Sequence, residues 1–170
     1  MHASQSPGGL RFLENLAYLV PGYHGYRSPE LRRGEDSRLR ARVCREIDVL
    51  LHAIENLSTQ WTARAPEDSL ALLGDHRARL LAFSHNVRLA PGHLAGFFET
   101  ERVAEVTLER VLEADLLIFQ DLEETQAHVE QGTRLSTAPR TVRKHLRELG
   151  ELLHRLDEHL IMRERILAGG

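Results

Sequence analysis

The chain has 170 residues, of which 42% are hydrophobic and 28% charged, and its formal net charge is -3. This length suffices for one domain with its own core, and the slight negative charge argues against a protein whose whole surface binds nucleic acid. Only 5% of the residues are aromatic, whereas Leu, Ala, Glu and Arg are frequent. The composition therefore favours an all-helical fold over an all-β fold.

Cysteine and lysine are both rare, and each bears on where the protein works. Cys44 is the single cysteine, so no intramolecular disulfide forms and nothing indicates an oxidising compartment. The apolar stretch from Leu10 to Val20 is interrupted by polar residues, so it is neither a signal peptide nor a membrane span. Lys144 is the single lysine among 22 basic residues, which indicates a GC-rich genome. We therefore expect a cytoplasmic protein of bacterial origin.

The N-terminal third of the chain is predicted to hold an arm, a short helix and an unusual loop. Residues 1–9 are small and polar, which is typical of a disordered arm. Apolar residues at helical spacing predict a short helix over residues 10–19, which Pro21 and Gly22 end. The loop that follows carries Tyr23, His24 and Tyr26, and Tyr18 precedes it closely.

Four longer helices are predicted after this loop. Ser28 is a favourable N-cap with Pro29 in the first helical position, so the first long helix is expected to run from 29 to 62. The second follows the break at 65–68 and ends at Pro91, and the third spans 93–130 as the longest element. The fourth begins after residues 136–139 and frays near residue 168.

Each long helix carries one apolar stripe, and such stripes are buried most simply against one another. We therefore predict an antiparallel up-down bundle of four long helices over residues 10–168. The short N-terminal helix and the Tyr/Gly loop are expected to cap one end of it. The rings of Tyr23, His24 and Tyr26, with Tyr18 nearby, would plug that end or offer a contact surface.

Some acids and histidines fall on the apolar stripes. Helical phase places Glu101 and Asp115 inward in the longest helix, His76 inward in the second long helix and His145 at the edge of the last stripe. Buried carboxylates must be paired, ligated or protonated, so Asp115 is expected to meet a histidine or Arg40. The alternative is a site for one divalent metal or a small ligand built from these four side chains.

Other metal-like spacings point to solvent. The pairs Glu151 with His154 and Glu124 with His128 fall on the polar faces of their helices, so a ferritin-like di-iron centre is not expected. A basic patch opens the last helix and would suit an anionic partner or a solvated surface. It comprises Arg140, Arg143, Lys144 and Arg147. Nucleic acid is not the expected partner, because no reading motif or interleaved aromatics accompany these residues.

The longest predicted helix is apolar on more than one face. Val106 and Leu117 project away from its main stripe, which indicates either a central position in the monomer or a contact with another chain. The leading hypothesis is a non-enzymatic helical interaction or scaffold protein that self-associates through Val106 and Leu117. The alternative from another functional class is a metal- or small-ligand-binding bundle that uses its inward acids and histidines.

Overall fold

The computed structural model describes residues 7–89, 95–100 and 103–169. These residues form six helices and no strand, which confirms the all-helical fold class. The helices are α1 (Pro7–Leu19), α2 (Arg32–Trp61), α3 (Glu67–Arg88), α4 (Ala95–Glu99), α5 (Glu105–Gly132) and α6 (Pro139–Leu167). Within the described part of the chain, no helix is both long and apolar enough to cross a membrane.

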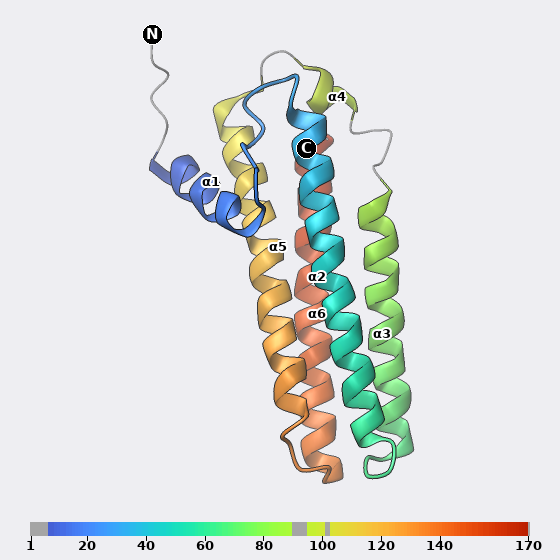
Figure 1. The fold of residues 1–170 in the computed structure, drawn as a ribbon. Coiled ribbons are helices and arrows are strands. Elements are labelled where there is room, and N and C mark those ends of the chain that lie inside the picture. Colours follow the sequence, from blue (N-terminus) through green and yellow to red (C-terminus); the bar gives the residue numbers. More distant parts are fainter. Residues whose placement is uncertain (1–6, 90–94, 101–102, 170) are drawn as a thin grey trace.

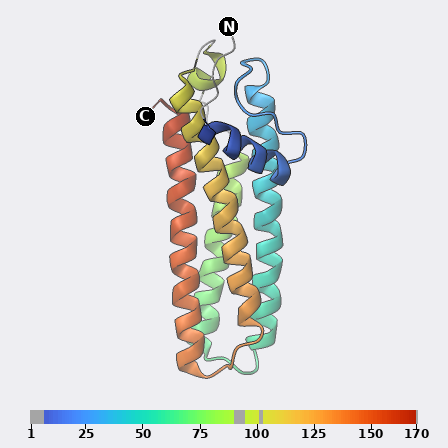
Figure 2. The ribbon, with the colours of Figure 1, turned by 90° about the vertical axis from the view of Figure 1, so that its left-hand side faces the viewer.

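The four long helices lie side by side along one axis (Figure 1). Helices α2 and α6 each pack against both α3 and α5, so the four contacts close a ring around a shared core. Successive long helices run in opposite directions, and α1 lies across the outside of α5, as the view in Figure 2 shows. The loop between α1 and α2 climbs along the upper part of this assembly (Figure 1).

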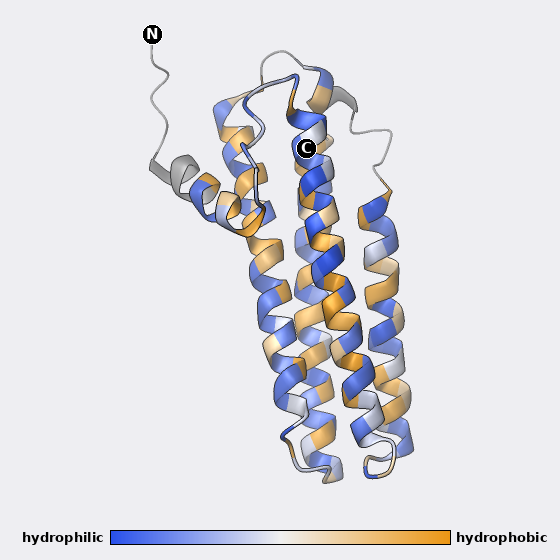
Figure 3. Cartoon of the chain, in the orientation of Figure 1, coloured by the Kyte–Doolittle hydropathy of each residue, from blue (hydrophilic) through white to orange (hydrophobic). Residues whose placement is uncertain are grey.

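The core consists of the predicted stripes. On α2 the stripe is buried along its whole length, from Leu39 at 1% exposed to Trp61 at 2% exposed. On α6 the stripe from Val142 to Leu156 is fully buried. Apolar and polar residues alternate along each long helix in Figure 3, because one face meets the core and the other meets solvent.

The first long helix starts three residues later than predicted. Ser28 does not cap it, because its hydroxyl donates to the Glu30 carboxylate at 2.6 Å instead. The backbone of residues 28–31 forms a turn, in which the Leu31 amide donates to the Ser28 carbonyl at 3.1 Å, and α2 begins only at Arg32. The predicted N-cap was therefore wrong.

The predicted single helix over residues 93–130 is also wrong, because the structure has the short α4 and then α5. The carbonyl oxygens of Phe97 and Thr100 accept hydrogen bonds from the Arg32 side chain, so α4 ends against a buried guanidinium. Ala104, which falls inside the predicted helix, is instead an exposed residue ahead of α5. A partner from another helix decided this boundary, and local sequence carries no sign of it.

The N-terminal boundary differs as well, since Pro7 to Gly9 belong to α1 and not to the predicted arm.

Helix α1 packs against α5, which thus contacts α1, α2 and α6. Around Leu116 the surface of α5 is apolar on several sides because it is shared among these neighbours, and Ile118 and Phe119 are buried. The breadth of this helix is accounted for largely within the monomer.

Candidate functional site

Two glycines shape the tyrosine loop. Gly22 and Gly25 have φ angles of +77° and +78°, a region that side-chain-bearing residues rarely adopt. This backbone conformation directs Tyr23 and Tyr26 inward, so that they are only 2% and 1% exposed. Their rings pack edge to face with centroids 5.7 Å apart. His24 stays exposed, and its backbone amide donates to the Glu35 carboxylate at 3.0 Å.

The buried carboxyl group of Asp115 accepts hydrogen bonds from both tyrosines of the loop. The Tyr26 hydroxyl donates to Oδ2 of Asp115 at 2.9 Å, and the Tyr23 hydroxyl lies 3.4 Å from the same oxygen. Nε of Arg163 donates to Oδ1 at 2.5 Å, and none of Asp115 is exposed. Burial raises the pKa of the Asp115 carboxyl, and the Arg163 guanidinium opposes that shift. Three donors therefore surround the Asp115 carboxyl group in place of water.

The chain of contacts continues from Asp115 through Arg163 to α2. Nη2 of Arg163 donates to the Tyr26 hydroxyl at 2.9 Å and to Oδ1 of Asp36 at 2.6 Å. Oδ2 of Asp36 accepts from Nε of Arg40 at 2.7 Å. Burial alone would lower the pKa of Arg163, but Asp115 and the other oxygens around it hold that pKa well above its usual value. We call Tyr23, Tyr26, Asp36, Arg40, Asp115 and Arg163 the polar network.

Arg40, the last member of the polar network, has one side-chain nitrogen without an acceptor among the described residues. Its Nη1 donates to the carbonyl oxygen of Val87 at 3.1 Å, so the side chain bridges α2 and α3. Its Nη2 is buried, and no acceptor among the described residues contacts it. An unfilled donor on a buried guanidinium costs free energy, which an incoming water or anion would recover.

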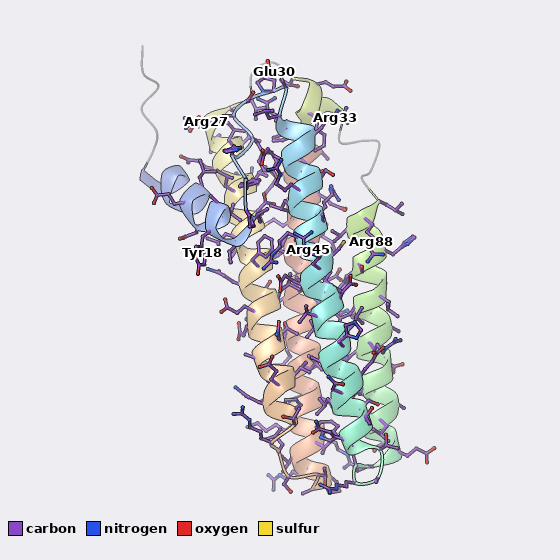
Figure 4. The ribbon with its side chains drawn as sticks, viewed as in Figure 1. Tyr18, Arg27, Glu30, Arg33, Arg45 and Arg88 are labelled. Atoms are coloured by element: carbon purple, nitrogen blue, oxygen red, sulfur yellow. The ribbon has the colours of Figure 1, made fainter. Side chains whose placement is uncertain are left out.

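Arg40 also lines a hollow on the outer side of α2 with a volume of about 400 Å³, which we call the outer hollow. Its charged and polar wall is formed by Arg33, Asp36, Ser37, Arg40 and Arg88. Ala41, Cys44 and Phe98 complete it with apolar surface. Arg33 and Arg88 stand at the upper ends of α2 and α3 (Figure 4). Three guanidinium groups and one carboxylate give this wall a positive balance.

A second hollow touches Arg40 from the other side, between α2, α3 and α6. This inner hollow has a volume of about 320 Å³ and a floor of buried core residues that includes Leu39 and Ile118. Asp157 and Glu164 stand along its wall together with Arg163. Its charges are mixed, so it is a less favourable place for an anion than the outer hollow.

Within the described residues, the hydrogen bonds of the Arg32 side chain go to backbone carbonyls at the upper end of the long helices. Arg32 is 1% exposed, and its Nε donates to the carbonyl oxygen of Tyr26 at 2.7 Å. Its Nη1 donates to the carbonyls of Phe97 and Thr100. Burial lowers the pKa of Arg32. Arg32 therefore ties the tyrosine loop to the end of α4, next to the outer hollow.

The three described members of the predicted metal or ligand set do not come together in the structure. Asp115, His76 and His145 are each buried, as helical phase predicted, and Glu101 lies outside the described residues. Asp115 bonds to Arg163, whereas Nε2 of His76 lies 3.0 Å from the carbonyl oxygen of Leu146. The two α6 residues in these contacts, Arg163 and Leu146, are separated by about 17 residues, or roughly 25 Å of helix. Within the described residues, no group of three metal-donor side chains gathers.

His145 belongs to a different environment at the lower end. Its ring stacks on His128 with centroids 3.9 Å apart and meets the edge of Trp61 at 5.9 Å. Nε2 of His128 donates to the backbone carbonyl of His145 at 2.9 Å, so His128 is half-buried and not fully solvated as predicted. Burial, with help from His128, lowers the pKa of His145 to about 4.

The predicted interaction residues divide into two groups. Tyr18 is 88% exposed and Val106 is 62% exposed, and His24 is also exposed. Figure 4 shows Tyr18 on the outer side of α1, turned away from the long helices. Leu117 is half-buried, while Tyr23 and Tyr26 are taken up by the polar network. The tyrosines of the loop therefore contribute to the interior.

The basic patch at the start of α6 is exposed, and most of it is matched by acids. Arg143 lies 3.4 Å from Asp68 of α3. Lys144 and Arg147 pair one turn along α6 with Glu148 and Glu151, at 3.6 Å and 3.8 Å. Arg140 is exposed at the start of the helix. The partners come from α3 and from α6 itself, and the pairs are those of a solvated surface.

Sequence reasoning singled out Asp115 and Arg40 but missed Asp36 and Arg163. The missed pair carries the same signal, because Asp36 is three residues before Leu39 and Arg163 is seven residues after Leu156, both on apolar stripes. Extending each stripe beyond its last apolar residue would have found them. The partner of Asp115 is Arg163 and not Arg40 or a histidine, although Arg40 belongs to the same network.

No protein-family model matches the chain, and no curated protein and no solved structure is significantly similar to it. The geometry of the polar network and the outer hollow is therefore the basis for the functional argument.

Proposed function

We propose that this protein is a small-ligand-binding helical bundle whose ligand carries an anionic group held in the outer hollow. The observation that carries the proposal is that Arg40, whose buried Nη2 has no acceptor among the described residues, lines a hollow together with Arg33 and Arg88. This is the ligand-binding alternative from the sequence, moved from inward acids and histidines to arginines.

Charge supports an anion at this place. Within the wall, only Asp36 opposes the three guanidinium groups, and Arg40 and Arg163 already occupy both of its oxygens. Guanidinium groups bind carboxylate and phosphate through parallel hydrogen bonds, and they remain charged at every physiological pH. The Ser37 hydroxyl adds a neutral donor to the same wall.

Size supports a small molecule. A hollow of about 400 Å³ falls within the range of small-molecule sites, which combine apolar walls with a few polar groups that fix orientation. Phe98 is 7% exposed and Cys44 is 6% exposed, so both form a firm apolar side of the hollow. The fixed polar network behind Arg40 holds that side chain between α2 and α3.

The test is calorimetric titration of the full chain with phenyl phosphate and benzoate, in the wild type and in Arg88→Gln. We expect binding by the wild type and at least about tenfold weaker binding by Arg88→Gln, the size of one lost charged hydrogen bond. Arg147→Gln is the matched control, because Arg147 is an exposed helix arginine distant from the hollow. Absence of binding by the wild type, or equal losses in both variants, would contradict the proposal.

Self-association is a second candidate function, favoured by one observation. Tyr18 on α1 and Val106 on α5 are large side chains that stay largely exposed in the monomer. Val106→Glu combined with Leu117→Glu should lower the mass measured by light scattering and leave helicity unchanged. A monomeric wild-type mass, or an unchanged oligomeric mass in the variant, would dispose of this interface.

A further inference from the structure

We infer that the anionic group bound in the outer hollow is a dianionic phosphate monoester on a compact organic body. The inference rests on the proposed anion binding and narrows it to one ligand class. The inference rests on the arginines of the wall. There are three of them, they come from two helices, and two of them form ion pairs only at the exposed surface.

Two of the three arginines hold carboxylates that a stronger anion can displace. Arg33 pairs with Glu99 at 2.7 Å, and both side chains are more than half exposed. Arg88 lies 3.4 Å from Asp48, with 60% and 49% of the two side chains exposed. Exposed ion pairs of this kind contribute little free energy, so exchanging Glu99 and Asp48 for a ligand costs little.

The third arginine is fixed. Arg40 is 7% exposed and is held by Asp36 on one side and by the Val87 carbonyl on the other. Its remaining nitrogen, Nη2, is buried and has no acceptor among the described residues. The site thus combines one fixed cation with two adjustable ones.

This arrangement fits a phosphate monoester better than a carboxylate. A carboxylate presents two oxygens in one plane, which a single guanidinium fork satisfies. A phosphate monoester presents three terminal oxygens and carries close to two negative charges at neutral pH. Arginines from two different helices and the Ser37 hydroxyl supply donors from several directions, which suits the larger number of oxygens.

The rest of the wall indicates what the phosphate is attached to. Ala41, Cys44 and Phe98 leave apolar surface beside the arginines, so an organic body gains contacts that inorganic phosphate lacks. The inner hollow lies on the other side of the Arg40 bridge and is not needed for this ligand.

The experiment compares phenyl phosphate with phenyl sulfate, which has similar size but carries one charge at every pH used. Calorimetric titration of the full chain at pH 5.0, 6.0 and 7.5 should show phenyl phosphate tightening by about tenfold as its second proton is lost near pH 6. Phenyl sulfate should bind more weakly and change little. Asp36, Cys44, Asp48 and Glu99 face or flank the hollow, and phenyl sulfate, which is measured beside the same groups, is the control for them.

Removal of the competing carboxylates sharpens the test. Glu99→Gln and Asp48→Asn should each tighten phenyl phosphate binding by about twofold to fivefold, the size of an exposed ion pair. Inorganic phosphate should bind more weakly than phenyl phosphate, because it gains no apolar contact. If phenyl phosphate, phenyl sulfate and benzoate bind equally well at every pH, anion binding stands and the phosphate inference falls. If none of them binds, both fall.

Discussion

The upper and lower ends of the long helices solve the burial of polar side chains in different ways. At the upper end, the polar network places two carboxylates, two guanidinium groups and two phenols in contact with one another. At the lower end, His76 and His128 each bond to a backbone carbonyl of α6, and His145 stacks on His128. One end buries carboxylates and guanidinium groups, and the other buries imidazole rings.

The difference follows from what each group costs to bury. A charge can be buried only with an opposite charge and hydrogen bonds around it, so the upper end needs residues from α2, α5, α6 and the tyrosine loop at once. A neutral imidazole has one N–H donor, and a backbone carbonyl lies within hydrogen-bond distance of His76 and of His128. Charges of the upper end are therefore interdependent, whereas the lower end tolerates change one residue at a time but responds to pH.

The largest effect is expected from Asp115→Ala. This change leaves Arg163 buried without one of its two carboxylates and removes the acceptor of both tyrosine hydroxyls. Breaking a buried ion pair from one side costs about 3 to 5 kcal/mol. Urea unfolding followed by circular dichroism would measure the loss in the free energy of unfolding.

The control for Asp115→Ala is Asp157→Ala. Asp157 pairs with Arg79 at 3.6 Å across a partly exposed surface, so its loss should cost less than about 1 kcal/mol. Similar costs for the two variants would show that the polar network is no more interdependent than a surface pair.

The next effect concerns pH and belongs to the lower end. His145 has its pKa lowered to about 4 in the folded protein, against 6.5 for an ordinary histidine. As pH falls below 6.5, the unfolded chain takes up this proton and the folded chain does not, so stability falls until about pH 4. Each pKa unit corresponds to about 1.4 kcal/mol, which gives a loss near 3 kcal/mol from this residue.

Comparison of the wild type with His145→Asn isolates that loss, because carboxylates titrate in both proteins. Unfolding free energies from pH 7 to pH 4 should decline less steeply in the variant. His154→Asn serves as the control, because His154 is largely exposed and lies 3.6 Å from Glu158. Parallel curves for the wild type and His145→Asn would mean that His145 is protonated in the folded protein as easily as in the unfolded chain.

A smaller effect is expected where α5 comes close to His145. A Cβ at Gly132 would lie 2.6 Å from Nε2 of His145 and 3.0 Å from a methyl group of Leu57. Since Leu57 is fully buried, the neighbours have little room to move, and Gly132→Ala should cost about 1 to 3 kcal/mol. Thermal unfolding would detect this as a lowered midpoint. An unchanged midpoint would show that the side chains of His145 and Leu57 shift at little cost.

Periodicity in the sequence predicted the helical class and the core because each stripe depends on its own residues alone. The stripes from Leu39 to Trp61 and from Val142 to Leu156 are buried as predicted. The start of α2 and the break before α5 were not predicted, because they depend on Ser28 bonding to Glu30 and on Arg32 reaching the carbonyls of α4. Such contacts join residues that no local pattern connects.

The candidate site was predicted only in part for the same reason. Helical phase shows that Asp115 and His76 point inward, but phase gives no position along the helix axis relative to a neighbour. Asp115 and His145 were grouped as one site, although Asp115 bonds to Arg163 near the end of α6 and His145 lies near its start. The outer hollow depends on how α2, α3 and α4 pack, and its exposed Arg33 and Arg88 read as ordinary surface residues in the sequence.

The smallest effect on the free energy of unfolding is expected from Gly74→Ala, which serves as a reference for the substitutions at both ends. Gly74 lies within α3, and a Cβ added there would meet nothing within 4 Å, so Gly74→Ala changes helix propensity alone. The free energy of unfolding should rise by roughly 0.5 to 1 kcal/mol, because alanine loses less backbone freedom on folding. Gly74→Ala and Gly132→Ala introduce the same methyl group with opposite expected signs. A loss of stability at Gly74 would show that the added methyl group destabilises a helix without any close contact, and a cost at Gly132 would then not be evidence for its contacts with His145 and Leu57.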